Sequence, residues 1–321
     1  MPFFSTVLLA QVLWGLGYTF TSGATQAWIA DEIGQERAGE AFLRGSQVGW
    51  MGALTAIPIS VSLGIVDIRL PIVLGGVLNV LFSGFLVVAM REESFKPKPP
   101  EDRTTLSLLL KTVRDTRQLV RRQPTLLALL AIGLFFGLYS EGFDRLWTPH
   151  LLESFSQAWT ALVNPVIWIG VIEAVALVAG IVATEFTRRR VDTHHAASIA
   201  RWLILFAAII VVALAGFGLA KNFWIAVVLY WLIGMARNAT SPLQATWLNL
   251  RIDDSRVRAT VFSVTSQIDA VGQMSGGPLV GAIGNHSIRA ALIASSLLLA
   301  PVIPLYALAA RHGEREASDV G

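Results

Sequence analysis

The chain has no cysteine and few charged residues. Without cysteine among its 321 residues, the protein has no disulfide framework, no thiolate metal site and no cysteine nucleophile. Asp, Glu, Lys and Arg make up only 15% of the residues, against about a quarter in an average soluble domain. Hydrophobic residues make up 54%, and the mean hydropathy is +0.60. This composition excludes an ordinary soluble globular protein, a disordered chain and a nucleic-acid-binding protein.

Long apolar stretches recur along the chain. A helix needs roughly 20 apolar residues to cross a hydrocarbon layer of about 30 Å. Stretches of that kind lie at 5–29, 41–65, 70–90, 124–149, 162–187, 197–219, 222–248, 257–283 and 288–310. In lipid the backbone polar groups must be satisfied within the segment itself, so each stretch is predicted to be a helix. The sequence therefore predicts an all-α polytopic membrane protein with nine transmembrane helices.

The distribution of basic residues predicts how these helices are oriented. If the loop at 31–40 lies inside and the loops alternate from there, nineteen Lys and Arg residues fall in inside segments and four in outside segments. Basic residues concentrate in the cytoplasmic loops of membrane proteins. We therefore expect a multi-pass protein of the plasma (inner) membrane with a cytoplasmic C-terminus and, because the number of spans is odd, an outside N-terminus.

One long polar segment, 91–123, separates three predicted spans from six. Its first part is rich in proline and charge, which prevents a helix. From Thr104 onward apolar residues gather on one helical face with Lys and Arg opposite. This pattern predicts an amphipathic helix on the cytoplasmic leaflet, with an exposed helix that caps the bundle as the alternative. The expected organisation is a partial N-terminal bundle at 1–90, a cytoplasmic linker at 91–123, a six-helix bundle at 124–310 and a cytoplasmic tail at 311–321.

A weak internal repeat relates the two parts of the chain. The loop DEIGQERAGEAF, which begins at Asp31, and the loop DDSRVRATVF, which begins at Asp253, each contain an acidic pair, then Arg-Ala, then Phe. If this repeat is real, the first span corresponds to the seventh. Three further spans are then expected before residue 1.

Three segments make the chain resemble the major facilitator superfamily. The segment FTSGATQAWIADEIGQERAGEAFLRGSQVG, at 20–49, resembles the fourth helix, inner loop and fifth helix of that family, in particular of its tetracycline and macrolide efflux branch. SEGFDRLWTPHLL, at 140–152, resembles the outer end of the seventh helix in that branch. RATVFSVTSQIDAVGQMSGGPLVGAIG, at 258–284, is similar to the eleventh helix. The resemblance implies helices four to twelve of a twelve-helix fold whose first three helices are missing.

The chain also departs from the family pattern. The antiporter motif of helix five, Gly-Pro-x-x-Gly-Gly, is not intact, although Gly45, Gly49 and Gly52 remain. The Gly-Asp-Arg loop between helices two and three is absent. A partial counterpart of it lies between helices eight and nine, from Gly180 to Arg190. Drug:proton coupling is therefore not indicated by the antiporter motif.

Charged residues inside the predicted spans are the first candidates for a functional site, because a charge in a bilayer is costly. Glu173 lies about 16 Å and Asp269 about 18 Å into their spans, near the membrane midplane. A carboxyl group withdrawn from water is more easily protonated, so either residue can exchange a proton or attract a cationic drug. Arg237 lies about 22 Å into its span and is expected to neutralise one of them. The alternative is a buried ion pair that fixes helix packing.

The span at 124–149 carries three further charges near its outer end. Glu141, Asp144 and Arg145 have the spacing i, i+3, i+4, so Glu141 and Arg145 are predicted to pair on one face. These residues either contact substrate or a proton, or form an outer salt-bridge network that shapes the helix end.

Charges in the inner loops form a second group of candidates. If the two halves meet on the inside, pairs between these loops could latch the outward-open state and break in the inward-open state. The alternative is a set of ordinary solvated charges. The candidates for such an inner gate are Asp31, Glu32, Arg37, Glu185 and Arg188.

These observations predict a secondary transporter that works by alternating access and is not an enzyme. The resemblance implies export of amphipathic drugs in exchange for protons, by a transporter that could be incomplete as this chain because its first three helices are missing. The expected partners are a small-molecule substrate and the lipid bilayer, without nucleic acid, cofactor or metal and with the proton as coupling ion. The alternative is a non-transporting scaffold or degenerate half-transporter that acts through assembly. A membrane enzyme is disfavoured because the polar loops are short and lack clustered catalytic residues.

Overall fold

The computed structural model describes residues 3–21, 32, 35–90, 124–156, 164–192, 195–251 and 255–318. Every regular element in these ranges is an α-helix, which confirms the predicted all-α class. The chain divides into two compact units, Met1–Arg103 and Thr104–Gly321. The predicted amphipathic helix of the 91–123 segment lies outside the described residues.

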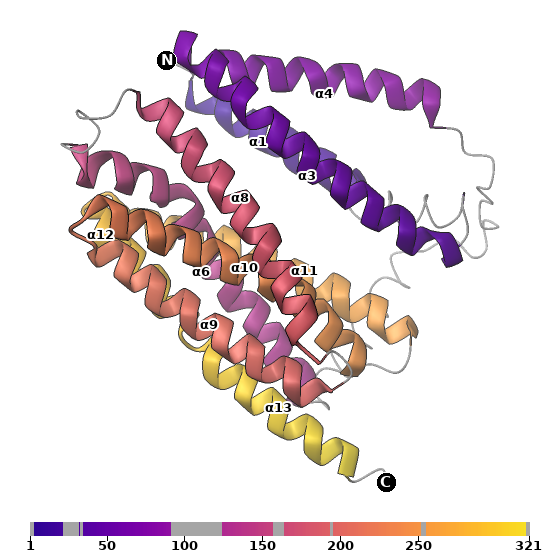
Figure 1. Cartoon of the computed structure of the whole chain (residues 1–321). Helices are drawn as coiled ribbons and strands as arrows, with labels where there is room; N and C mark the ends of the chain where they lie inside the picture. The colour runs from indigo at the N-terminus through magenta and orange to yellow at the C-terminus, as the bar shows by residue number, and fades with distance from the viewer. Residues whose placement is uncertain are drawn as a thin grey trace. The chain divides into compact units, whose positions relative to one another are not determined.

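The described part of the first unit consists of α1 (Phe4–Thr21), α3 (Gln35–Val66) and α4 (Leu70–Ala89) (Figure 1). A short turn joins α3 to α4, where the backbone N–H of Arg69 donates to the Asp67 carboxylate at 2.8 Å. Pro71 stands in the first turn of α4, where a proline needs no hydrogen-bond partner. None of the α4 side chains is buried. An apolar helix with this surface is suited to lipid or to other membrane helices.

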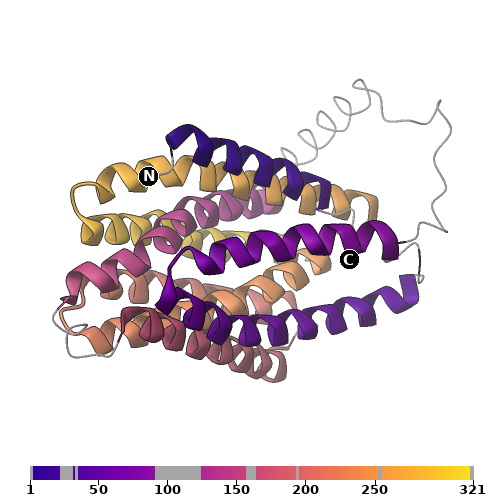
Figure 2. The same cartoon turned by 90° about the horizontal axis from the view of Figure 1, so that it is seen from above.

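The second unit contains α6, α8, α9, α10, α11, α12 and α13, which run largely alongside one another (Figure 1 and Figure 2). Side-chain caps define two of the helix starts: Asn164 accepts from the N–H of Val166 at α8, and Ser287 from that of Ala290 at α12. The helices span Pro124–Ser154 (α6), Pro165–Arg190 (α8), Ala196–Leu219 (α9), Phe223–Arg251 (α10), Ser255–Gly284 (α11), Ile288–Leu299 (α12) and Val302–Ser318 (α13).

These helices coincide with the nine predicted stretches once α12 and α13 are taken as the single apolar segment Ile288–Arg311. Within the described ranges, seven segments are long and apolar enough to cross a membrane. The other two predicted stretches, now α1 and α11, are less apolar within the described ranges than a span of roughly 20 apolar residues. Helix α1 contributes a shorter apolar run, Leu8–Gly17, and α11 does not qualify, because polar residues such as Asp269 and Gln273 interrupt it.

Helix α6 packs against α11, α12 and α13, while α9 packs against α10, α12 and α13. Helices α6 and α11 approach each other closely at glycines, which have no side chain to keep the two backbones apart. A Cβ atom at Gly276 would collide with the Leu138 carbonyl oxygen, and one at Gly137 with the Asp269 carbonyl oxygen. Small residues allow two backbones to come this close. This contact holds α11 beside α6 at the depth of the candidate site.

Candidate functional site

A cavity of about 220 Å³ lies among three helices of the second unit. The lining residues of α10 and of α11 are spaced by whole or nearly whole turns, as expected for a helix that lines a cavity with one face. The lining residues are Phe136, Tyr139, Ser140, Glu141 and Asp144 of α6, Arg237, Thr240, Ser241 and Gln244 of α10, and Asp269 and Gln273 of α11. The cavity therefore combines aromatic walls, hydroxyl and amide groups, and both signs of charge.

Arg237 of α10 and Asp144 of α6 form a bidentate ion pair across this cavity. The two guanidinium nitrogens donate to the two carboxylate oxygens at 2.5 and 3.0 Å. The guanidinium also lies over the rings of Tyr139 and Phe143, with its carbon 5.8 and 5.5 Å from the ring centroids. The Arg237 side chain remains 31% exposed and that of Asp144 48% exposed. This pairing corrects the expectation that Arg237 neutralises Glu173 or Asp269.

Glu141 and Arg145 pair within α6, as their spacing predicts. The Arg145 Nε donates to Glu141 at 3.1 Å, and the Arg145 side chain is 70% exposed. Of this pair only Glu141 is among the lining residues, whereas both Asp144 and Arg237 line the cavity. Each of the two pairs is neutral by itself.

Asp269 lines the cavity beside the α6 backbone at Gly137. Its carboxylate accepts a hydrogen bond of 2.7 Å from the side-chain amide of Gln273, one turn further along α11. In the part of the chain that the structure describes, no ion pair involves Asp269. The amide itself carries no charge. Arg237, the arginine of the cavity wall, is bound to Asp144 and acts on Asp269 only through the attraction between their charges.

Glu173 lies on α8 and is not among the cavity-lining residues. Its carboxylate accepts a hydrogen bond of 2.7 Å from the Tyr230 hydroxyl. The Tyr230 ring stacks on Trp147 with centroids 4.6 Å apart, and on Phe143 with centroids 5.9 Å apart. Glu173 and Asp269, which the sequence predicts to lie near the membrane midplane, therefore have different surroundings. The role of Glu173 as a proton site stays a prediction.

On the polar face of α10, Arg237 was a predicted site residue, whereas Thr240, Ser241 and Gln244 were not. Arg237, Thr240, Ser241 and Gln244 follow the spacing i, i+3, i+4, i+7, which is a detectable signal for a helix face. Gln244 also donates to the Tyr306 hydroxyl of α13. Tyr139, in contrast, carried no local signal, because one aromatic residue in an apolar helix is ordinarily part of the core.

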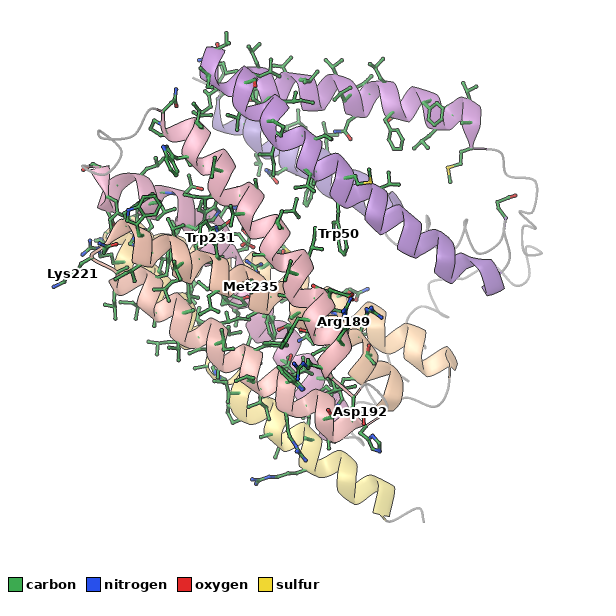
Figure 3. All side chains as sticks on the ribbon, in the orientation of Figure 1. Trp50, Arg189, Asp192, Lys221, Trp231 and Met235 are labelled. Atoms are coloured by element: carbon green, nitrogen blue, oxygen red, sulfur yellow. The ribbon has the colours of Figure 1, made fainter. Side chains whose placement is uncertain are left out.

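The inner-gate candidates are described only in part. Glu185 accepts from Arg188 at 2.7 Å and from Arg189 at 2.6 Å, both within α8 (Figure 3 labels Arg189). Asp31 and the side chain of Arg37 lie outside the described residues, whereas Glu32 lies within them. A latch between the two inner loops stays a prediction.

The sequence matches the Major Facilitator Superfamily over residues 1–266. The chain belongs to this superfamily. A major facilitator protein is a multi-pass membrane transporter of small molecules and not an enzyme. The chain is therefore a secondary transporter by family. The coarse functional expectation from the sequence is confirmed.

Among solved structures, the superfamily fold is also found in one described as a bacterial homolog to the human lysosomal transporter Spinster, inward-facing and unoccupied. The two chains are 15% identical with a TM-score of 0.56, over 91% of this chain and 74% of that chain. At this identity the similarity concerns the fold alone. No curated protein sequence matches. The efflux branch and the missing first three helices therefore stay predictions.

Proposed function

We propose that this major facilitator protein exports small amphipathic molecules in exchange for protons, and that the α6–α10–α11 cavity binds substrate and proton in turn. The observation that carries the proposal is the environment of Asp269. This residue is a carboxylate at membrane depth, inside a cavity, with a neutral amide as its hydrogen-bond partner. A charge in such a place is costly unless a positive charge joins it.

The charges around the cavity support exchange. The Glu141–Arg145 and Asp144–Arg237 pairs are each neutral, so among these five residues in and beside the wall the remaining charge is that of Asp269. Either a proton or a cationic substrate compensates that charge. The two then compete for one group, and a competition of this kind couples the entry of one to the exit of the other.

The other lining residues favour an amphipathic substrate. Phe136 and Tyr139 offer aromatic surface, which attracts apolar rings and organic cations. Ser140, Ser241 and Gln244 offer hydrogen-bonding groups on the adjoining helices. The resemblance to the tetracycline and macrolide efflux branch agrees with this substrate class.

The experiment measures ethidium, an aromatic monocation, in liposomes that contain the 321-residue chain. An imposed pH gradient is expected to drive ethidium movement, and ethidium is expected to move protons in return. The Asp269→Asn variant should lose the pH dependence, because an amide cannot cycle a proton while its size preserves packing. Glu153→Gln, at an exposed carboxylate near the end of α6, is the matched control and should behave as the wild type.

Two outcomes would contradict the proposal. Unchanged proton-driven ethidium flux in Asp269→Asn would remove Asp269 from the coupling step. Absence of any proton-linked flux from the wild-type chain would favour the alternative, a non-transporting scaffold or degenerate half-transporter that acts through assembly. Repeating the measurement with tetracycline and a macrolide tests the branch.

A further inference from the structure

We infer that Glu173 is a positioning residue for the Asp144–Arg237 ion pair, acting through Tyr230 and Phe143. The inference rests on the proposed function only in that the cavity is taken as the substrate site. Glu173 itself lies outside the cavity wall. Its effect on the site passes through three contacts in sequence, each of which the structure places.

The first contact joins α8 to α10. The Tyr230 hydroxyl donates to Glu173 Oε1 at 2.7 Å, and the Tyr230 residue is only 8% exposed. A hydrogen bond to a charged acceptor is stronger than one between neutral groups. Little water is available to replace it around so buried a ring. Glu173 therefore determines where the end of the Tyr230 side chain lies.

The second contact joins Tyr230 to α6. Its ring lies at 30° to that of Phe143, with centroids 5.9 Å apart, and at 29° to that of Trp147, with centroids 4.6 Å apart. Phe143 is 3% exposed and is also packed against the edge of Phe217. A close-packed ring of this kind has little space to move. A shift of Tyr230 is therefore passed to Phe143.

The third contact lies between Phe143 and the ion pair. The guanidinium carbon of Arg237 is 5.5 Å from the Phe143 ring centroid, within the range of a cation–π interaction. Phe143 is adjacent in sequence to Asp144, the carboxylate that binds the same guanidinium. The ring that Tyr230 supports is thus one of the surfaces that hold Arg237 at the cavity.

The same helices provide a matched control. Trp231, labelled in Figure 3, donates its ring N–H to the Ile172 carbonyl oxygen at 3.0 Å. This hydrogen bond joins α8 and α10 one residue away from the Glu173–Tyr230 bond. The Trp231 ring is not a stacking partner of Phe143, which contacts Phe217 and Tyr230. Trp231→Phe therefore weakens the α8–α10 contact without disturbing the route to Arg237.

The first experiment does not depend on any substrate. Thermal unfolding midpoints are measured in detergent for E173A, for D144N and for the double variant. If Glu173 acts on the ion pair, the double variant loses less than the sum of the two single losses, because residues in one network are not additive. The same cycle with W231F in place of E173A should be additive.

The second experiment measures ethidium affinity. E173A and Y230F are expected to weaken binding about tenfold, which corresponds to a coupling free energy of about 1.4 kcal/mol. E173Q should restore most of this affinity, because its amide oxygen still accepts the Tyr230 hydrogen. W231F should lower the unfolding midpoint but not the affinity.

The outcomes separate the alternatives. An additive E173A–D144N cycle, or an E173Q variant as damaged as E173A, would overturn the positioning role. Loss of proton coupling in E173Q, with an additive cycle, would instead support the prediction that Glu173 itself carries a proton. If the wild type does not bind ethidium, the proposed function fails for this probe, while the thermal cycle still decides the positioning role.

Discussion

Asp144 and Arg237 stand 93 positions apart in the chain and bind each other through two hydrogen bonds across the α6–α10 contact. The pair engages the arginine of the cavity wall with a carboxylate that is itself nearly half exposed. Asp269 accepts its hydrogen bond from the uncharged amide of Gln273 and is not the carboxylate that Arg237 binds. The binding of Arg237 to Asp144, and not to Asp269, is the structural basis of the proposed exchange.

Replacing Asp144 should destabilise the protein more than replacing Arg237. Asp144→Asn leaves the guanidinium over two rings without a counter-ion, whereas Arg237→Gln leaves a carboxylate with more access to its surroundings. Because the pair is partly exposed, Asp144→Asn should lower the free energy of unfolding by about 1–3 kcal/mol, between the values for surface and buried pairs. Thermal or denaturant unfolding in detergent measures this loss.

The control for the ion-pair prediction is Glu141→Gln, which breaks the more exposed pair with Arg145. We expect a loss of about 1 kcal/mol or less there, as for surface pairs. Combining Asp144→Asn with Arg237→Gln leaves neither charge unpaired and should recover part of the loss. Equal effects of Asp144→Asn and Glu141→Gln would contradict the prediction.

Two adjacent glycines of α11 should respond differently to alanine. A Cβ atom at Gly276 would collide with the Leu138 backbone, so Gly276→Ala must separate α6 from α11. We expect a loss of about 1–3 kcal/mol in the free energy of unfolding, as for other overpacked sites. Gly277 has nothing within 4 Å, so Gly277→Ala should be neutral or stabilising by up to about 1 kcal/mol. Thermal unfolding of both variants provides the comparison, and a tolerated Gly276→Ala would show that the two helices can separate freely.

His150 should be a structural link between α6 and α9. Its side chain is fully buried, with Nε2 2.9 Å from the Phe217 carbonyl oxygen and Nδ1 3.2 Å from the Ser154 hydroxyl. His150→Leu should lower the free energy of unfolding by about 1–3 kcal/mol, because the buried polar groups left behind lose their partner. The exposed His286, which contacts its own helix, is the control, and His286→Leu should change stability by about 0.5 kcal/mol or less. Equal free energies of unfolding for His150→Leu and His286→Leu would contradict a structural role for His150 between α6 and α9.

The orientation of the protein can be tested by cysteine labelling, since the chain has no cysteine of its own. Lys221 and Arg189 lie toward opposite ends of the second unit (Figure 3). The charge distribution predicts that a membrane-impermeant maleimide added outside labels Lys221→Cys, and labels Arg189→Cys only after the membrane is permeabilised. Outside labelling of position 189 in intact cells would reverse the predicted topology.

The positions of the helices follow from the sequence for a local reason. In lipid a backbone N–H or C=O group finds no water, so an apolar run satisfies its own hydrogen bonds by forming a helix. Prolines and caps then define ends, as Pro165 after Asn164 does for α8. The Glu141–Arg145 pair was equally predictable, because one helical turn brings the two residues together.

The partners between helices were decided by the tertiary structure. Arg237 was expected to meet Glu173 or Asp269, whereas it binds Asp144, and Glu173 meets Tyr230. A residue's depth in the membrane can be counted along its own helix, but the face that it turns to its neighbours cannot. That face depends on how the helices rotate and cross, and here glycines such as Gly276 determine how close α11 comes to α6. The candidate carboxylates could therefore be found by counting along the chain, but their counter-ions could be found only after the helices were packed.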